Sequence, residues 1–288
     1  MAPEARSRGH LNPGTDARVS RLAPPPDLVD TVVHFWVPEW DLPAGRSSRQ
    51  MVLSYPLLNL VLQPGAPEGD VTLHGPRTAV SYRVLSGRGW AIGVLLRPTA
   101  VPAMLGAARP VVTILRDLVD SWVALDAPEL MSNVLSSMAG GGSCRTEAAV
   151  GAVAGWLRVR LRASGAANRD GRLANALLEL LDAMPSDTTE RRDAEPPRFV
   201  AEVARELGTS TRTLQRVALG YIGFTPAALI RRRRLQDAAD RLRRDPTIDL
   251  ARLALDVGYS DHAHLTRDFR QVLGFTPSAY RDGQNDTR

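Results

Sequence analysis

The last stretch of about ninety residues contains an internal duplication, and this repeat constrains the fold more than any other feature of the chain. One copy is VAEVARELGTSTRTLQRVALGYIGFTPAALIR, residues 200–231, and the other is LARLALDVGYSDHAHLTRDFRQVLGFTPSAYR, residues 250–281. In both copies an alanine is followed four residues later by a glycine, and both contain the tetrapeptide Gly-Phe-Thr-Pro. Because two copies are fewer than a stacked helical scaffold needs, the repeat favours two helix-turn-helix units over a solenoid.

The positions shared by the two copies each have a physical reason. A small residue on the first helix lets the second helix cross it closely, and a glycine in the turn accepts a positive φ. In Gly-Phe-Thr-Pro, glycine ends a helix, phenylalanine packs into the core, threonine caps the next helix and proline occupies its first turn. The residues expected in the other roles are Ala204 and Ala254 (crossing), Gly208 and Gly258 (turn), Ser210 and Ser260 (cap, with Thr209 as the alternative to Ser210), and Leu214 and Leu265 (core).

The charge of the chain is concentrated at the same end. All 36 basic residues are arginine, and residues 198–288 hold 16 of them against 11 acidic residues, which accounts for the whole net charge of +5. A basic excess confined to one end indicates a polyanionic partner there. The run Arg231–Arg234 is not a single contact stripe, because four consecutive helical residues point around the whole circumference. We expect this run to be a solvated face with one or two phosphate contacts.

The remainder of the chain is predicted to contain strands first and then helices. Residues 1–26, rich in Arg, Gly and Pro, are expected to be a disordered tail. Short apolar segments within residues 31–96 are broken by Gly and Pro and predict the strands of a small β barrel or sandwich. From about residue 102 to 162 apolar residues, including Leu118 and Trp122, recur at helical spacing. A helix over 173–184, a polar linker over 185–197 and helices over 199–207, 211–220, 226–243, 249–256, 261–272 and 277–282 complete the expected order.

Several classes of protein are excluded by composition. Cys144 is the only cysteine, so the chain has neither an internal disulfide nor a cysteine metal cluster, which fits the cytoplasm. The N-terminus lacks the apolar core of a signal peptide, and no apolar run approaches the roughly 18 residues of a membrane span. His34 and His74 are interpreted as ordinary strand histidines, and residues 86–93 as a hairpin turn whose glycine spacing does not fit a phosphate loop. We expect no cofactor, no metal and no catalytic residue.

The second copy of the repeat carries a recognisable family pattern. Its residues in this pattern are Ala254, Val257, Gly258, Tyr259, Asp261, His264, Leu265, Arg267, Phe269, Arg270, Gly274, Pro277, Tyr280 and Arg281. On this pattern, residues 172–283 resemble the DNA-binding domain of the AraC/XylS family of transcription activators. The resemblance implies a linker helix at about Pro226–Arg243 between the two units. It also implies two recognition helices in successive major grooves of double-stranded DNA, roughly 34 Å apart.

The resemblance also assigns candidate DNA contacts. They are Ser210, Thr211, Arg212, Gln215 and Arg216 in the first unit, and Asp261, His262, Ala263, His264, Arg267 and Arg270 in the second. Arginine reads guanine and glutamine reads adenine through paired hydrogen bonds, or either side chain holds phosphate, as we expect for Arg270. Asp261 is expected to cap its helix rather than to accept a hydrogen bond from cytosine.

The two units are not expected to contribute equally to DNA binding. After Gln215 the first unit continues RVALGYIGF, where the family pattern carries more basic and aromatic residues. Gly220 further weakens the end of this helix. The first unit is therefore expected to bind DNA less strongly or less specifically than the second.

The N-terminal domain is expected to span residues 27–165. Within it, residues 52–105 resemble the small, partly cupin-like domain of a subset of these regulators, mainly through Gly75-Pro76, the Gly87–Gly89 turn, Gly93 and Arg97-Pro98. The resulting fold class is α+β with two domains: a small β barrel with following helices, and an all-α domain. The resemblance implies a small-molecule effector, a homodimer and RNA polymerase as partners, with effector-binding residues unknown. Most aromatic residues of the set Trp36, Trp40, Tyr55, Tyr82 and Trp90 are expected to lie in the core, and one or two are candidates to line such a pocket.

A DNA-repair enzyme and an architectural DNA-binding protein are the two alternative functions. A DNA-repair enzyme fused to the same DNA-binding module requires a reactive cysteine in a Pro-Cys-His setting, whereas Cys144 lies in GGGSCRTE. An architectural protein without sequence preference predicts binding that depends steeply on salt and little on sequence.

Overall fold

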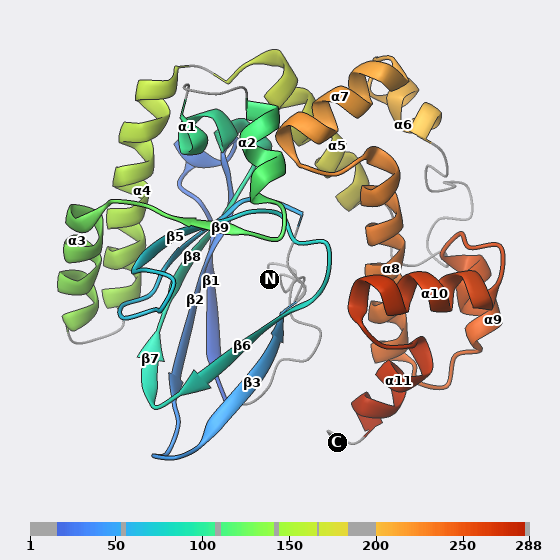
Figure 1. Ribbon diagram of the computed structural model, residues 1–288, viewed down its shortest axis with the longest axis horizontal. Coiled ribbons are helices and arrows are strands. Elements are labelled where there is room, and N and C mark those ends of the chain that lie inside the picture. Colours follow the sequence, from blue (N-terminus) through green and yellow to red (C-terminus); the bar gives the residue numbers. More distant parts are fainter. Residues whose placement is uncertain are drawn as a thin grey trace.

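A computed structural model describes residues 16–52, 56–106, 111–140, 144–165, 167–183 and 200–285 of the chain. The expected linker over 185–197 lies outside the described residues, as do residues 1–15 of the expected tail. Figure 1 shows two parts, with the strands and the helices α1–α4 on one side and the helices α5–α11 on the other.

The strands form one main antiparallel sheet and one separate ribbon. The main sheet has the order β1-β2-β8-β4-β5-β9, with β7 paired to β2. Its strands are β1 (Arg18–Leu22), β2 (Val32–Asp41), β4 (Asn59–Leu62), β5 (Val71–His74), β7 (Arg88–Trp90), β8 (Ile92–Leu96) and β9 (Trp122–Ala124). The ribbon pairs β3 (Ser47–Val52) with β6 (Ser81–Ser86), in the register Ser47 opposite Ser86.

The two faces of the main sheet differ in chemistry. Alternate residues such as Phe35, Leu60 and Val94 are fully buried against α3 (Pro128–Ala139) and α4 (Arg145–Ser164), which lie on one side of the sheet. On the opposite face Trp36 donates from Nε1 to Oδ1 of Asn59 over 3.1 Å. A methyl group built on Gly93 would lie 1.8 Å from the Trp36 ring, so only glycine fits beneath this indole.

Three expectations for this part need correction. Residues 18–22 were expected within a disordered tail, but they form β1 because their backbone pairs with residues 35–39 of β2. Residues 122–124 were expected to be helical, but Asp120 takes a positive φ of 58°, which ends the helical course, and the chain then pairs with β5 as β9. The sheet is open rather than a closed barrel, since β1 and β9 end the strand order without pairing to each other among the described residues.

Short helices connect the sheet to the rest of the chain. They are η1 (Pro26–Leu28), η2 (Pro98–Ala100), α1 (Val101–Leu105) and α2 (Val111–Leu118). Proline lies in the first turn of η2, where its fixed φ suits a helical start. Apart from β9, the strands precede helices α1–α4, as the sequence predicts.

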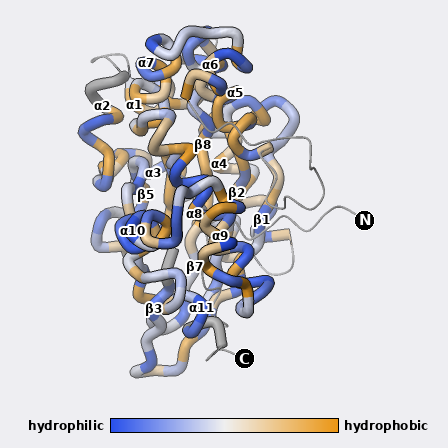
Figure 2. Tube along the Cα trace, turned by 90° about the vertical axis from the view of Figure 1, so that its right-hand side faces the viewer, coloured by the Kyte–Doolittle hydropathy of each residue, from blue (hydrophilic) through white to orange (hydrophobic). Residues whose placement is uncertain are grey.

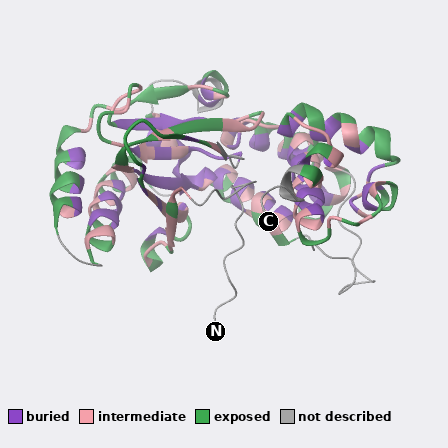
Figure 3. Cartoon of the chain, turned by 90° about the horizontal axis from the view of Figure 1, so that it is seen from below, coloured by how far each residue is buried: buried purple, intermediate pink, exposed green. Residues whose placement is uncertain are grey.

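The C-terminal part is all helical, as the sequence predicts. Its helices are α5 (Arg169–Ala183), α6 (Val200–Glu206), α7 (Thr211–Tyr221), α8 (Pro226–Arg244), α9 (Leu250–Asp256), α10 (His262–Leu273) and α11 (Pro277–Asn285). One core joins α5, α6, α7 and the start of α8, and a second joins the rest of α8 to α9, α10 and α11. The linker helix α8 therefore contributes to both cores. Figure 3 shows the buried residues on the inward sides of these helices, and Figure 2 shows hydrophilic stretches on their outer side.

Candidate nucleic-acid interface

The turns of the two helix-turn-helix units have the same backbone hydrogen bonds. Gly208 and Gly258 both adopt positive φ, 61° and 82°. The residue after each glycine donates its N–H to the crossing alanine: Thr209 to Ala204 over 2.9 Å, and Tyr259 to Ala254 over 2.8 Å. Both alanines and the core leucines Leu214 and Leu265 are buried. These repeat-based predictions are confirmed.

The caps of the two recognition helices differ. Ser210 caps α7, with its Oγ accepting from the N–H of Thr213 over 3.2 Å. In α10 the cap is Asp261, whose Oδ1 accepts from the N–H of His264 over 2.7 Å. The expectation that Ser260 caps this helix is wrong, because its hydroxyl donates to Asp261 instead. The backbone N–H of His264 holds the pKa of the Asp261 carboxyl below its usual value, which favours the charged cap.

The Gly-Phe-Thr-Pro turns also have the expected geometry. Gly223 and Gly274 adopt φ values of 84° and 83°. Thr225 and Thr276 each accept, at Oγ1, the N–H of the residue three places on, over 3.2 and 3.1 Å. The two phenylalanines are partly buried against the cores of their units. The tetrapeptide thus shapes each unit, while the recognition helices before it present the polar side chains.

The second recognition helix presents a continuous polar face. His262, Ala263, His264, Arg267 and Arg270 are all exposed on α10. Thr266, which the sequence reasoning missed, lies on this face one turn after His262, and its Oγ1 is 3.2 Å from Nε2 of that residue. Helical spacing of four residues was the signal that could have found it.

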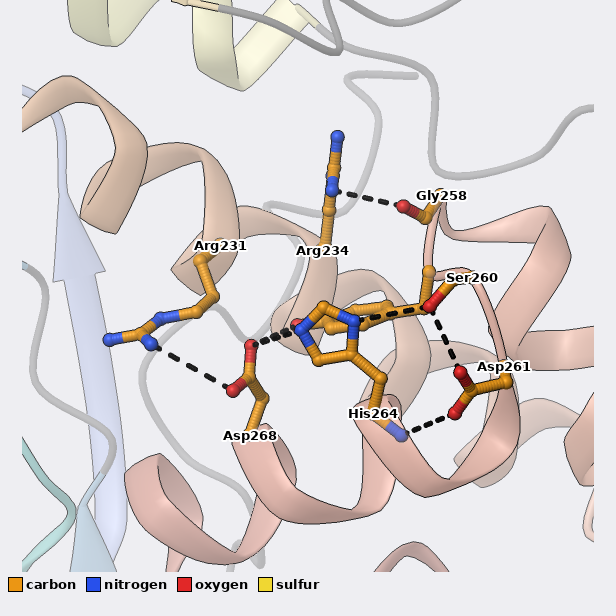
Figure 4. A network of polar contacts seen from close by, with 8 residues as sticks. Arg231, Arg234, Gly258, Ser260, Asp261, His264 and Asp268 are labelled. Atoms are coloured by element: carbon orange, nitrogen blue, oxygen red, sulfur yellow. Dashed lines mark hydrogen bonds and ion pairs between the residues drawn. The ribbon is translucent and has the colours of Figure 1, made fainter.

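Asp268 organises a polar network behind this face (Figure 4). The hydroxyl of Tyr259 donates to Asp268 over 3.2 Å, and burial together with this carboxylate raises the tyrosine pKa. Nε2 of His264 lies 4.0 Å from the same carboxylate, and its Nδ1 lies 3.4 Å from the Ser260 hydroxyl. Both ring nitrogens of His264 are therefore directed at protein groups. This arrangement fixes the ring orientation on the exposed face.

The first recognition helix presents fewer polar groups. Arg212, Gln215 and Arg216 are exposed on α7, and so is Leu219 on the same face. The guanidinium of Arg216 donates from both terminal nitrogens to Asp170 of α5, over 2.7 and 3.1 Å. This pair lowers the pKa of Asp170. Arg212 and Gln215 have no side-chain hydrogen bond within the described part of the chain.

The four consecutive arginines of α8 do not form a solvated face, which corrects that expectation. Arg232 and Arg233 are buried, with exposed fractions of 6% and 4%. Arg232 donates to the carbonyl of Arg77, and Arg233 pairs with Asp237 one turn on. Arg234 donates to the carbonyl of Gly258 over 3.0 Å, and Arg231 lies 3.8 Å from Asp268 (Figure 4). The run supports the linker helix and the second unit from inside.

The comparisons with known proteins agree with this geometry. Residues 203–283 match the family described as "Helix-turn-helix domain", and residues 20–116 match a domain of unknown function, DUF6597. The C-terminal domain is an AraC/XylS-type helix-turn-helix domain. The matched range runs from within α6 to within α11 and therefore includes the linker helix and most of both units.

Curated proteins are similar to a part of this chain. The chain is 34% identical over 113 residues to the HTH-type transcriptional regulator RipA of Corynebacterium glutamicum, covering 39% of this chain and 31% of RipA. It is 32% identical over 114 residues to an uncharacterized HTH-type transcriptional regulator of Haemophilus influenzae, covering 39% and 34%. The matching segment thus spans about a third of the length of each relative. These relatives are named as transcriptional regulators.

A solved structure is similar along most of the chain. ToxT from Vibrio cholerae is 11% identical, with 92% of this chain and 97% of that chain covered and a TM-score of 0.41. At this score no property of that protein carries over. Among the described residues, no helix is long and apolar enough to cross a membrane, and no group of three or more His, Cys, Asp or Glu is placed to hold a metal ion.

Proposed function

We propose that the chain is a sequence-specific DNA-binding transcriptional regulator whose two recognition helices, α7 and α10, enter successive major grooves. The observation that carries this proposal is the matched geometry of two units joined by one rigid helix that belongs to both cores. Two such helices on one linker fit successive grooves of one duplex, about one helical turn apart. The basic excess of residues 198–288 supports attraction to the phosphate backbone.

The second unit supplies the main sequence-reading contacts in this proposal. Arg267 projects from the exposed face of α10 without a side-chain partner among the described residues, so its guanidinium is available for guanine. His262 and Thr266 lie on the same face, and Arg270 at its far end suits a backbone phosphate. Asp261 serves as the helix cap and contacts no base. His264 contributes a fixed ring edge.

The sequence predicts Ser210, Thr211, Arg212, Gln215 and Arg216 as the contacts of the first unit, and in the structure Arg216 is paired with Asp170. Ser210 is occupied as a cap, and the remaining side chains form a small polar face bounded by Leu219. Arg212 and Gln215 are exposed and suit a base contact or a phosphate contact. The face is smaller than that of α10, which fits a lesser role for this unit.

The N-terminal domain is proposed to bind a small-molecule effector or to form a homodimer. An open pocket of about 780 Å³ lies where the ends of β2 and β7 meet the start of α4. Trp40 and Trp90, two of the aromatic residues predicted as candidates, line it together with Arg18, Arg88 and Arg145. A pocket of this size, lined by two tryptophans and otherwise mainly by polar and charged residues, suits a small polar ligand. RNA polymerase is the further partner that such a regulator requires, and the bacterial cytoplasm is where it acts.

We propose no enzymatic role for the chain. The DNA-repair alternative depends on Cys144, which is exposed just before α4. Stoichiometric transfer of a methyl group from alkylated DNA to Cys144, measured by mass spectrometry, would favour that alternative over ours.

The function is tested by binding selection from random DNA followed by titration at stated salt. We expect Arg267→Ala to cost about 1–3 kcal/mol on the selected sequence and to relax preference at one base pair. Arg270→Ala is expected to weaken binding to all sequences alike and to reduce the salt slope by about one. An architectural protein predicts instead that no sequence is enriched and that both substitutions act alike.

A further inference from the structure

Arg216 is the one arginine of the first recognition face that has a bidentate partner in the described structure. It lies on the same face of α7 as Arg212, one turn later. Its NH1 and NH2 both donate to the two oxygens of Asp170, in a parallel fork. Its side chain is nevertheless 58% exposed, so the guanidinium is held at the surface rather than buried.

This fork uses the donors that a base contact needs. Arginine recognises guanine through two parallel N–H donors aimed at O6 and N7, and it holds phosphate or carboxylate in the same way. While Asp170 accepts from both terminal nitrogens, that edge of Arg216 is not available to DNA. A carboxylate beside the groove also repels phosphate.

We propose that Asp170 is a positioning residue that withholds Arg216 from DNA, so that the first unit reads with Arg212 and Gln215 alone. The proposal rests on the proposed function, because it describes how DNA binding by the first unit is regulated. The weaker DNA binding expected of the first unit then has a cause in α5, outside the sequence of α7. The second unit has no equivalent device, because Arg267 has no side-chain partner in the described part of the chain.

The position of Asp170 is set by the N-terminal domain. Asn175 of the same helix α5 donates to the carbonyl of Asp30 over 2.8 Å and accepts from the N–H of Thr99 over 3.3 Å. One turn further on, Glu179 accepts from Arg97 over 2.8 Å. α5 also shares a core with α7 through Ala174, Leu177 and Leu181. Asp170 lies before these residues, at the start of the helix. A shift transmitted from the N-terminal domain to this start therefore moves Asp170 relative to α7. A conformational change in the N-terminal domain would then release Arg216 from Asp170.

The start of α5 is also tied to the far end of α7. Asn168 donates from Nδ2 to the hydroxyl of Tyr221 over 2.6 Å, while its Oδ1 accepts from the N–H of Gly171. Tyr221 in turn packs against the core of the N-terminal domain. The fork and this hydrogen bond both hold the start of α5 near the recognition helix. Both contacts must open if that start moves away from α7.

Asp170→Asn tests the proposal, with Asp27→Asn as the matched control. Asp27 accepts a second bidentate arginine, Arg158, on the N-terminal domain, so the control removes the same kind of pair away from α7. We expect Asp170→Asn to raise affinity for the selected DNA about five-fold or more and to add a base preference at one position of the first half-element. Asp27→Asn is expected to leave affinity and preference unchanged.

The double variant Asp170→Asn with Arg216→Ala separates release from simple removal of charge. If Asp170 withholds Arg216, the gain disappears when Arg216 is alanine. A gain that persists in that background, or that is equal for all sequences, overturns the proposal, and so does unchanged affinity of Asp170→Asn. Failure of the proposed function looks different: the wild-type protein then shows no sequence preference at all, and Arg267→Ala has no selective effect.

Discussion

At the scale of single residues, two buried histidines decide how the stability of the N-terminal domain depends on pH. His74 is 7% exposed and its Nε2 lies 2.9 Å from the Thr72 hydroxyl on the same strand. Burial lowers the pKa of His74 to about 4, and the same cause lowers that of His34 to about 4. Both histidines are therefore neutral at neutral pH. Their place in strands agrees with the prediction that they are ordinary strand residues.

This burial predicts an acid-sensitive N-terminal domain. In the unfolded chain histidine takes up its proton near pH 6.5, whereas the folded protein resists protonation until about pH 4. The contribution of the neutral histidine to the free energy of unfolding is therefore fully present above pH 6.5 and is lost as the pH falls toward 4. Replacement of His74 by glutamine should remove part of this loss, on the order of 2 kcal/mol. The measurement is urea unfolding at pH 7 and pH 4.5, with the exposed His262→Gln as control; equal pH dependence in both variants would contradict the account.

The partners of several arginine side chains could not be predicted from the sequence. The burial of Arg232 and Arg233 depends on carbonyl and carboxylate partners, and one of these, the carbonyl of Arg77, lies more than 150 positions away in the chain. The fork between Arg216 and Asp170 depends in the same way on how α5 packs against α7. Composition and helical period give the face of a helix but not the acceptor opposite it. Such tertiary partners could not be predicted from the repeat.

At the scale of elements, local chemistry was predictable and long-range pairing was not. The turns of both units follow from glycine, alanine and threonine at fixed spacing, and the structure confirms them. Strands β1 and β9 were missed because each is short and exists only through its neighbour in the sheet. Leu118 and Trp122 are spaced as in a helix, but the positive φ of Asp120 between them ends the helix before Trp122.

The unequal caps of the recognition helices give a prediction for elements. Ser210 and Ser260 occupy the same place in the two copies, yet only Ser210 accepts a backbone N–H of its helix. Ser210→Ala should therefore destabilise the C-terminal domain by about 1 kcal/mol, whereas Ser260→Ala should change it by less than about 0.5 kcal/mol. Chemical denaturation of the full chain, followed by circular dichroism, measures both. Equal losses would mean that the two helices begin in the same way.

At the scale of the whole molecule, one short segment of the N-terminal domain contacts both helix-turn-helix units. A methyl group built on Gly223 would lie 3.4 Å from Pro76, and the N–H of Val80 donates to the carbonyl of Val272 over 3.1 Å. Asp120 holds this segment by accepting from the N–H of Thr78 over 2.8 Å. The two Gly-Phe-Thr-Pro turns therefore lie against one loop. This loop sets how the two units are presented together.

Removal of the Asp120 side chain should loosen this contact. In Asp120→Ala the amides of Thr78 and Val80 are expected to exchange their hydrogens about ten-fold faster, because a hydrogen bond to a charged group is lost. Hydrogen-exchange mass spectrometry measures this on the full chain. Asp70→Ala is the matched control, since Asp70 accepts from the N–H of Gly65 in a turn of the β4–β5 hairpin. Unchanged exchange at residues 78 and 80 in Asp120→Ala would show that the segment is held by other contacts.

Genomic footprinting with the purified full chain shows whether α7 and α10 read one duplex together. We expect a shared motif of two half-elements whose centres lie about 10 base pairs apart, one turn of DNA, with the stronger base preference in the half-element read by α10. Protected sites without a shared motif, or a motif with a single half-element, would contradict it.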